Sequence, residues 1–101
     1  LVQQAMTPAY DRKKDANHNY LSEQAAKLGW FVIDTSKFAQ YHGGWPDAVW
    51  AKPGRVVLVE YKVGNETLND KEERFRQLWP AEYEIVRDLD DVVRVTNGAS
   101  E

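Results

Sequence analysis

The segment over residues 56–62, VVLVEYK, restricts the possible folds more than any other part of the chain. Successive residues of a strand point to opposite faces, and in this segment both faces are apolar until Glu60. A strand with two apolar faces lies in the middle of a sheet and is covered on each side. Since helices are the usual cover of such a sheet, the segment predicts an α/β domain.

Further periodicities place helices and strands around this central strand. Leu21, Ala25 and Leu28 form one apolar stripe at helical spacing. Asn69 and Glu72 are spaced as a capping box at the start of a second helix. The predicted elements are a helix over 15–28, strands over 30–33, 47–51 and 56–62, a helix over 70–79, a strand over 83–86 and a last helix capped by Asp88 and ending at residue 95. The order α-β-β-β-α-β-α predicts a small mixed β-sheet flanked by helices.

Length and composition indicate one domain over residues 1–101, with residues 1–12 as a flexible arm because they lack clear periodicity. A chain of 101 residues builds only a small core, which favours a homodimer. The absence of cysteine excludes disulfides and cysteine-based zinc sites. No apolar run is long enough for a membrane helix. We therefore expect a cytoplasmic protein.

The end of the central strand carries the first candidate functional residues. Glu60 and Lys62 are two positions apart, so their side chains point to the same face. An acid and an amine thus emerge together from an otherwise apolar strand. Taken alone, this pattern is common by chance and equally describes an ion pair at a solvated strand end.

Asp47 adds a second carboxylate at the start of the preceding strand. If residues 52–55 form the turn of a hairpin, counting outward from that turn places Asp47 opposite Glu60. Two carboxylates at this separation suit one Mg²⁺ or Mn²⁺ ion, and the carbonyl of Tyr61 is a candidate third ligand. Asp47 alone also fits a turn residue after a proline.

These three residue types suit the hydrolysis of a phosphodiester. A bound metal polarises the phosphate and lowers the pKa of a water molecule. The ammonium group of Lys62 can orient that water or stabilise charge that develops on the phosphate. This chemistry requires no covalent nucleophile and no small-molecule cofactor.

Several motifs occur in an order and spacing that is more specific than any one of them. The motifs are Asp15-Ala16-Asn17, Gly44-Trp45-Pro46-Asp47, Val59-Glu60-Tyr61-Lys62, Leu68-Asn69-Asp70-Lys71-Glu72, Phe75 and Trp79. In this order, over roughly residues 11–95, the chain resembles the PD-(D/E)XK nuclease superfamily. Within it, the chain is similar to small phage-type nucleases related to VRR-NUC domains and to archaeal-type Holliday junction resolvases. The resemblance implies a restriction-endonuclease-like core and a magnesium-dependent endodeoxyribonuclease.

The resemblance also implies roles for individual residues. Asp47 and Glu60 correspond to the metal ligands, and Lys62 corresponds to the catalytic lysine. Many relatives carry a glutamate ligand on the first helix, where this chain offers Asn17, nearby Asp15, or neither.

Other residues are candidates for contacts with DNA. The basic cluster Arg12, Lys13 and Lys14 can bind phosphates. Ser36, Lys37 and His42 lie before Asp47 in a loop that touches DNA in resolvase-like relatives. The aromatic residues of that loop suit stacking on unpaired bases or burial against a second subunit. For each of these residues, an ordinary solvated or packed role is the simpler interpretation.

The predicted function is cleavage of DNA at Holliday junctions or other branched structures. Two alternatives are a non-catalytic nucleic-acid-binding or assembly module that retains the nuclease fold, and a sequence-specific restriction-type nuclease. A net charge of −3 favours the binding module slightly over an enzyme that holds DNA tightly, although a metal site must itself be acidic. A chain of 101 residues leaves little room for the recognition elements of a restriction enzyme.

Overall fold

The computed structural model describes residues 9–98, with side chains from residue 14 onward. Its elements are α1 (Ala9–Lys27), β1 (Phe31–Asp34), the 3₁₀-helix η1 (Ser36–Gln40), β2 (Ala48–Lys52), β3 (Arg55–Tyr61), α2 (Asp70–Leu78), β4 (Tyr83–Val86) and α3 (Leu89–Thr96). Three α-helices and a four-stranded sheet in the order α-β-β-β-α-β-α confirm the predicted architecture. The short η1 was not predicted, because its polar and aromatic sequence has no clear period.

The four strands form one mixed sheet in the order β1-β2-β3-β4. β1 pairs with β2 and β2 with β3 in antiparallel orientation, whereas β3 and β4 are parallel. The sheet is therefore mixed, as predicted, and β3 is central to it. A parallel pair needs a crossover, which here includes α2.

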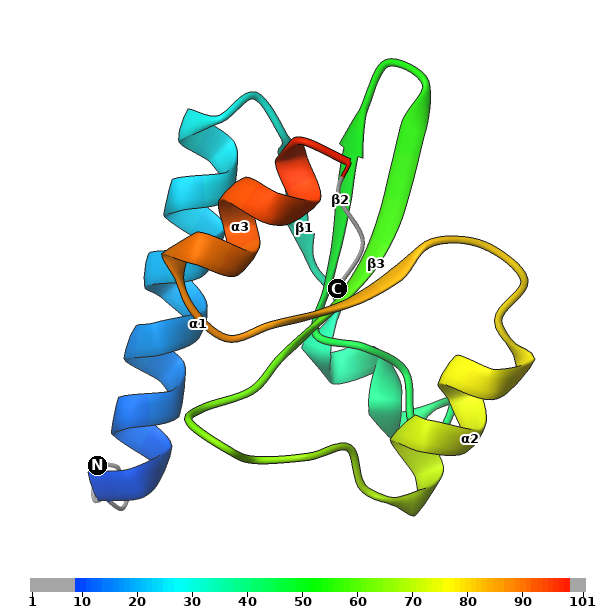
Figure 1. Ribbon diagram of the computed structural model, residues 1–101. Coiled ribbons are helices and arrows are strands. Elements are labelled where there is room, and N and C mark those ends of the chain that lie inside the picture. Colours follow the sequence, from blue (N-terminus) through cyan, green and yellow to red (C-terminus); the bar gives the residue numbers. More distant parts are fainter. Residues whose placement is uncertain (1–8, 99–101) are drawn as a thin grey trace.

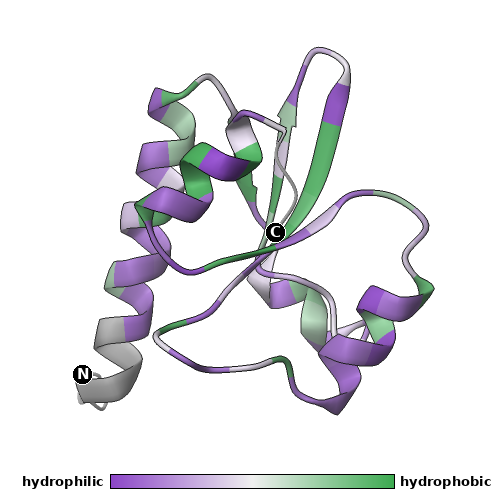
Figure 2. Ribbon diagram, in the orientation of Figure 1, coloured by the Kyte–Doolittle hydropathy of each residue, from purple (hydrophilic) through white to green (hydrophobic). Residues whose placement is uncertain are grey.

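The first helix begins at Ala9, so the prediction that residues 1–12 form a flexible arm is wrong for residues 9–12. The apolar stripe marks only the half of α1 that packs on the sheet, where Leu21 and Ala25 are fully buried. The rest of α1 is largely hydrophilic (Figure 2), so its sequence has no apolar period to reveal the helix. Residues 1–8 lie outside the described part of the chain.

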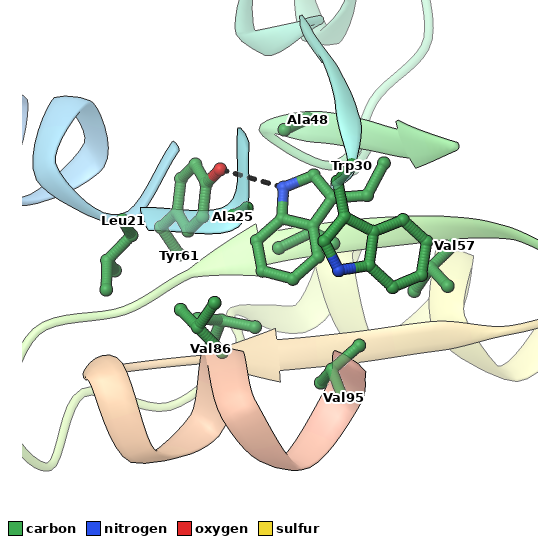
Figure 3. Packing of buried hydrophobic residues seen from close by; sticks show 11 residues of the cluster. Leu21, Ala25, Trp30, Ala48, Val57, Tyr61, Val86 and Val95 are labelled. Atoms are coloured by element: carbon green, nitrogen blue, oxygen red, sulfur yellow. Dashed lines mark hydrogen bonds between the residues drawn. The ribbon is translucent and has the colours of Figure 1, made fainter. Parts of the chain in front are cut away.

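Helices α1 and α3 pack together on one side of the sheet, and α2 lies apart from them (Figure 1). We call the covered side the core face; Val57, Val59 and Tyr61 of β3 point to it. The core face packs against Leu21 and Ala25 of α1 and the buried valines of α3 (Figure 3). Within the described residues, no helix is long and apolar enough to cross a membrane.

Three aromatic residues of the core have polar atoms that are satisfied by hydrogen bonds. Trp50 donates from Nε1 to the hydroxyl of Tyr61 at 3.0 Å, and that hydroxyl lies 2.7 Å from Oγ of Ser22 (Figure 3 shows the first of these bonds). Trp30 donates from Nε1 to Oγ1 of Thr96 at 2.9 Å. These bonds offset the cost of burying the polar atoms and fix how α1 and α3 sit on the sheet.

The opposite side, here called the site face, carries Leu58 and Glu60 of β3 and is only partly covered. The register aligns Phe31, Ala51 and Val56 in one row of this face, one residue from each of the first three strands. Leu58 is 3% exposed, but Val56 is 58% exposed and Phe31 67%. The prediction of cover on both sides is therefore right for Leu58 and Glu60 near the end of β3 and wrong for Val56 near its start.

Candidate active site

The register of the β2–β3 hairpin brings the two predicted carboxylates together. Ala48 pairs with Val59, so Asp47 and Glu60 occupy the next position along the same pairing, as predicted. The carboxylate of Asp47 crosses to β3, where its Oδ2 accepts a hydrogen bond from the backbone N–H of Tyr61 at 2.9 Å. Asp47 is thereby held beside the strand that carries Glu60.

The segment before Asp47 is fixed at two points. Thr35, which is buried, donates its backbone N–H to the carbonyl of Asp47 at 2.8 Å and its hydroxyl to the carbonyl of Pro46 at 3.0 Å. Gly44 has a positive φ of 85° and lies so close to α2 that a Cβ atom there would collide with the backbone carbonyl of Lys71. Only glycine allows this approach, which joins the loop to the start of α2.

Lys62 lies on the site face with Glu60, as strand alternation predicted. Its Nζ is 3.6 Å from Oε2 of Glu60 and donates a hydrogen bond of 2.8 Å to Oε1 of Glu72. Glu60 and Lys62 are 4% and 5% exposed, so these ionisable groups interact largely away from bulk water.

Glu72, which the sequence predicted only as part of a capping box, also takes part in this site. It completes the expected capping box: its backbone N–H donates to Asn69, and its Oε1 accepts from the backbone N–H of Asn69 at 2.9 Å. The same oxygen accepts the bond from Lys62. The capping role was the simpler interpretation of the sequence, and the structure adds an electrostatic role in the site.

Burial raises the pKa of Glu60 to about 9, and the neighbouring charges of Asp47 and Glu72 add to this effect. Burial also disfavours the ammonium form of Lys62, but the hydrogen bond to Glu72 and the charge of Glu60 outweigh it and raise the pKa of Lys62. For Glu72, the bonds from Lys62 and from the backbone of Asn69 outweigh burial and lower its pKa. Glu60 and Glu72 thus share one lysine, and of these two carboxyl groups Glu60 is the one with the raised pKa.

Tyr83 of β4 was not predicted as part of this neighbourhood. It pairs with Leu58 in the parallel register and so lies on the site face. Burial, followed by the charges of Glu60 and Glu72, raises its pKa. Its hydroxyl is buried and has no hydrogen-bond partner within residues 9–98. Strand alternation in β4 indicates its face, but only the pairing with β3 shows which residues it adjoins.

The donor set of the site suits a divalent cation with a preference for oxygen. Asp47, directly before β2, and Glu60 of β3 supply carboxylate oxygens, the kind of ligand that such a cation prefers. Asp47 and Glu60 would hold such an ion. Within the described chain, however, no group of three or more His, Asp or Glu side chains is already arranged around a metal position. Further ligands therefore have to come from a backbone carbonyl such as that of Tyr61, from water or from substrate.

The two candidate ligands on α1, Asp15 and Asn17, make no polar contact with the site residues within the described chain. Asp15 is exposed, and no hydrogen bond or ion pair connects it or Asn17 with Asp47, Glu60 or Lys62. Asn17 is half-buried, and its amide nitrogen has no partner among the residues described. The sequence left open Asn17, Asp15 or neither, and this choice stays a prediction.

The predicted substrate-binding residues are scattered. Lys14 lies 3.9 Å from Glu66 in an ion pair, while the side chains of Arg12 and Lys13 fall outside the described part. Ser36 and Lys37 are exposed in η1, where Ser36 donates from its backbone and its hydroxyl to Asp34. None of these contacts joins one predicted substrate-binding residue on α1 to one on η1.

His42 belongs to an aromatic cluster between the loop and α2. Its ring lies edge-on to Phe75, with the centroids 5.6 Å apart, and Trp45 contacts the same ring at 5.4 Å. Together with Leu78 and Trp79 these residues line a shallow apolar hollow of about 250 Å³. Trp45 and Phe75 are therefore packing residues that anchor α2 beside Asp47.

Comparison with protein-family models, with curated proteins and with solved structures finds no match for this chain.

Proposed function

We propose that this protein is a metal-dependent nuclease that hydrolyses phosphodiester bonds in DNA. One observation carries the proposal: Asp47 and Glu60 stand opposite each other on adjacent strands, with Nζ of Lys62 3.6 Å from Glu60. Two acids and an amine on one sheet face are the minimum set for this chemistry. The motif resemblance and the order α-β-β-β-α-β-α support a restriction-endonuclease-like core.

Each residue then has a separate task. Asp47 and Glu60 would hold a Mg²⁺ or Mn²⁺ ion, which when bound polarises the phosphate and acidifies a water molecule. Glu60 must release its proton to serve as a ligand. Lys62, kept cationic by Glu72, can stabilise negative charge on the phosphate or position the attacking water. Glu72 is a positioning residue, since it acts through Lys62.

The choice of substrate rests on the resemblance. Branched DNA such as a Holliday junction is the proposed substrate, and a homodimer in the cytoplasm is the proposed form of the protein. The exposed Val56 and Phe31 on the site face support the dimer, because a second copy could cover this apolar row.

The test is a cleavage assay with four-way junctions, flaps, single strands and linear duplex, each with Mg²⁺, Mn²⁺ or EDTA. Asp47→Asn and Lys62→Ala should abolish cutting, and EDTA should stop the wild type. Arg74→Ala is a matched control on the exposed surface of α2 and should cut normally. Metal-dependent cutting that survives both site substitutions contradicts the assignment of the site.

A non-catalytic nucleic-acid-binding module is a second candidate. It is supported by the absence of a preformed cluster of three or more His, Asp or Glu side chains in the described chain. This candidate predicts binding of branched DNA without cutting under any metal condition. Electrophoretic mobility shifts measured beside the cleavage assay separate the two.

A further inference from the structure

A cavity of about 350 Å³ lies between α2 and β4, next to the candidate active site. It is lined by Thr67, Leu68, Glu73, Arg76, Tyr83, Ile85 and Arg87, and we call it the β4 pocket. Ile85 pairs directly with Glu60, and the backbone N–H of Lys62 donates to the carbonyl of Val86 at 3.2 Å. Since paired strands lie about 4.8 Å apart, the floor of the pocket is one strand away from the proposed catalytic residues.

The pocket lining carries an excess of positive charge. Arg76 and Arg87 face one acid, Glu73, which leaves one net positive charge among the lining residues. Arg76 is bound to Glu73, so its charge is partly neutralised. Arg87 is the other cation, and no carboxylate pairs with its guanidinium within the described residues.

Arg87 is held in place by backbone carbonyls. Its Nη1 donates to the carbonyls of Gly64 and Glu66 at 2.9 and 2.6 Å. A guanidinium has five N–H donors, and those on Nε and Nη2 of Arg87 have no protein acceptor in the part of the chain that is described. The exposed hydroxyl of Thr67 likewise makes no hydrogen bond there. The pocket therefore offers a cation held in place, Arg87, whose remaining N–H donors have no acceptor among the described residues.

We propose that the β4 pocket binds a second phosphate group of the nucleic-acid strand whose scissile phosphate lies at Glu60 and Lys62. Arginine is the side chain best shaped for two hydrogen bonds to phosphate oxygens. A nucleic-acid strand rises about 3.4 Å per nucleotide. A phosphate in the pocket therefore belongs to a nucleotide one or two positions from the scissile phosphate. The inference rests on the proposed nuclease function and adds a site that positions the substrate strand.

The phosphate can be an internal phosphodiester or a terminal phosphate, and two probes distinguish these sources. The probes are the thymidine dinucleotide with one internal phosphodiester, TpT, and its 5′-phosphorylated form, pTpT. Backbone amide shifts of the full chain are followed by NMR in EDTA, where no cleavage occurs. Shifts at Thr67, Ile85 and Arg87 with both probes indicate the phosphodiester, and shifts with pTpT alone indicate the terminal phosphate.

Arg87→Gln should weaken the binding of the responding probe by roughly tenfold or more, the usual effect of losing a charge-assisted hydrogen bond. Because Arg87 also ties down a loop, Thr67→Val provides a second variant that breaks no bond within the protein, and it should weaken binding severalfold. Arg74→Gln on the same helix as Arg76 lies outside the pocket and should bind as the wild type does. Thermal unfolding of each variant checks the fold.

The inference is overturned if neither probe shifts the pocket amides, or if Arg87→Gln and Thr67→Val both bind like the wild type. This result is separable from failure of the proposed function. A protein that cuts DNA although its pocket amides do not respond refutes only the pocket. A protein that binds pTpT in the pocket but cuts nothing refutes only the nuclease.

Discussion

Glu60→Gln should stabilise the metal-free protein while abolishing its proposed activity. Glu60 is 4% exposed, and burial together with Asp47 and Glu72 raises its pKa from 4.5 to about 9. The folded protein therefore holds the side chain in its neutral form at pH 7, whereas the unfolded chain ionises it. Glutamine has the shape of the neutral acid and keeps an N–H donor for Glu72, but it cannot release a proton to bind a cation.

The magnitude follows from the linkage between proton binding and stability. Between pH 4.5 and pH 9, folded Glu60 binds a proton that the unfolded chain releases, so the free energy of unfolding decreases as the pH rises through this window. The slope approaches about 1.4 kcal/mol per pH unit, which amounts to roughly 3 kcal/mol at pH 7. Below pH 4.5 both states are protonated and the penalty is absent.

Urea unfolding in EDTA at pH 5, 6, 7 and 8 tests this prediction. Glu60→Gln should be nearly equal to the wild type at pH 5 and more stable by roughly 3 kcal/mol at pH 7. Mg²⁺ should then raise the melting temperature of the wild type more than that of the variant, because a cation favours the ionised acid. Glu73→Gln, an acid on the same helix as Glu72, is the control and should show no such pH dependence.

Two outcomes would refute the reasoning. A Glu60→Gln protein that is less stable than the wild type at pH 7 would mean that Glu60 is stabilised as a carboxylate. A difference in stability that stays constant from pH 5 to pH 8 would mean that the substitution acts through packing and not through the proton.

Three further predictions concern the surroundings of the site. Tyr83→Phe removes a buried hydroxyl without a partner in the described chain and should raise the free energy of unfolding by up to about 1 kcal/mol; a clear loss in urea unfolding would contradict this. Gly44→Ala should lower stability by about 1–3 kcal/mol and impair cleavage, because a Cβ atom collides with Lys71 next to Asp47; unchanged stability would show that the loop can move. Val56→Lys should convert the proposed homodimer to a monomer in sedimentation equilibrium, and a dimer that persists would place the interface elsewhere.

Local patterns predicted most elements to within a residue or two. The strand over residues 83–86 was placed correctly, and the capping residues Asn69 and Asp88 begin α2 and α3 as expected. These signals work because a cap or an alternating strand involves only neighbours in the chain. The start of α1 was missed because the sequence of its first turns has no apolar stripe that could mark them.

The pairing of Asp47 with Glu60 was also accessible from the sequence. A short hairpin turn sets the register of its two strands, so counting outward from residues 52–55 was sufficient. Lys62 followed from alternation within β3. These three positions are determined by one hairpin, which makes the core of the candidate site a local feature.

The rest of the site depends on contacts that only the tertiary structure forms. Glu72 reaches Lys62 because the loop after β3 returns α2 to the site face, and Arg87 lies beside the site because β4 pairs in parallel with β3. Neither placement can be read from residue spacing, since packing and not a turn sets the distance between segments joined by a crossover. The sequence alone thus determined the strands, the caps and two facing carboxylates. Tertiary packing decided that a third acid holds the lysine, that Glu60 keeps its proton, and that a cationic pocket adjoins them.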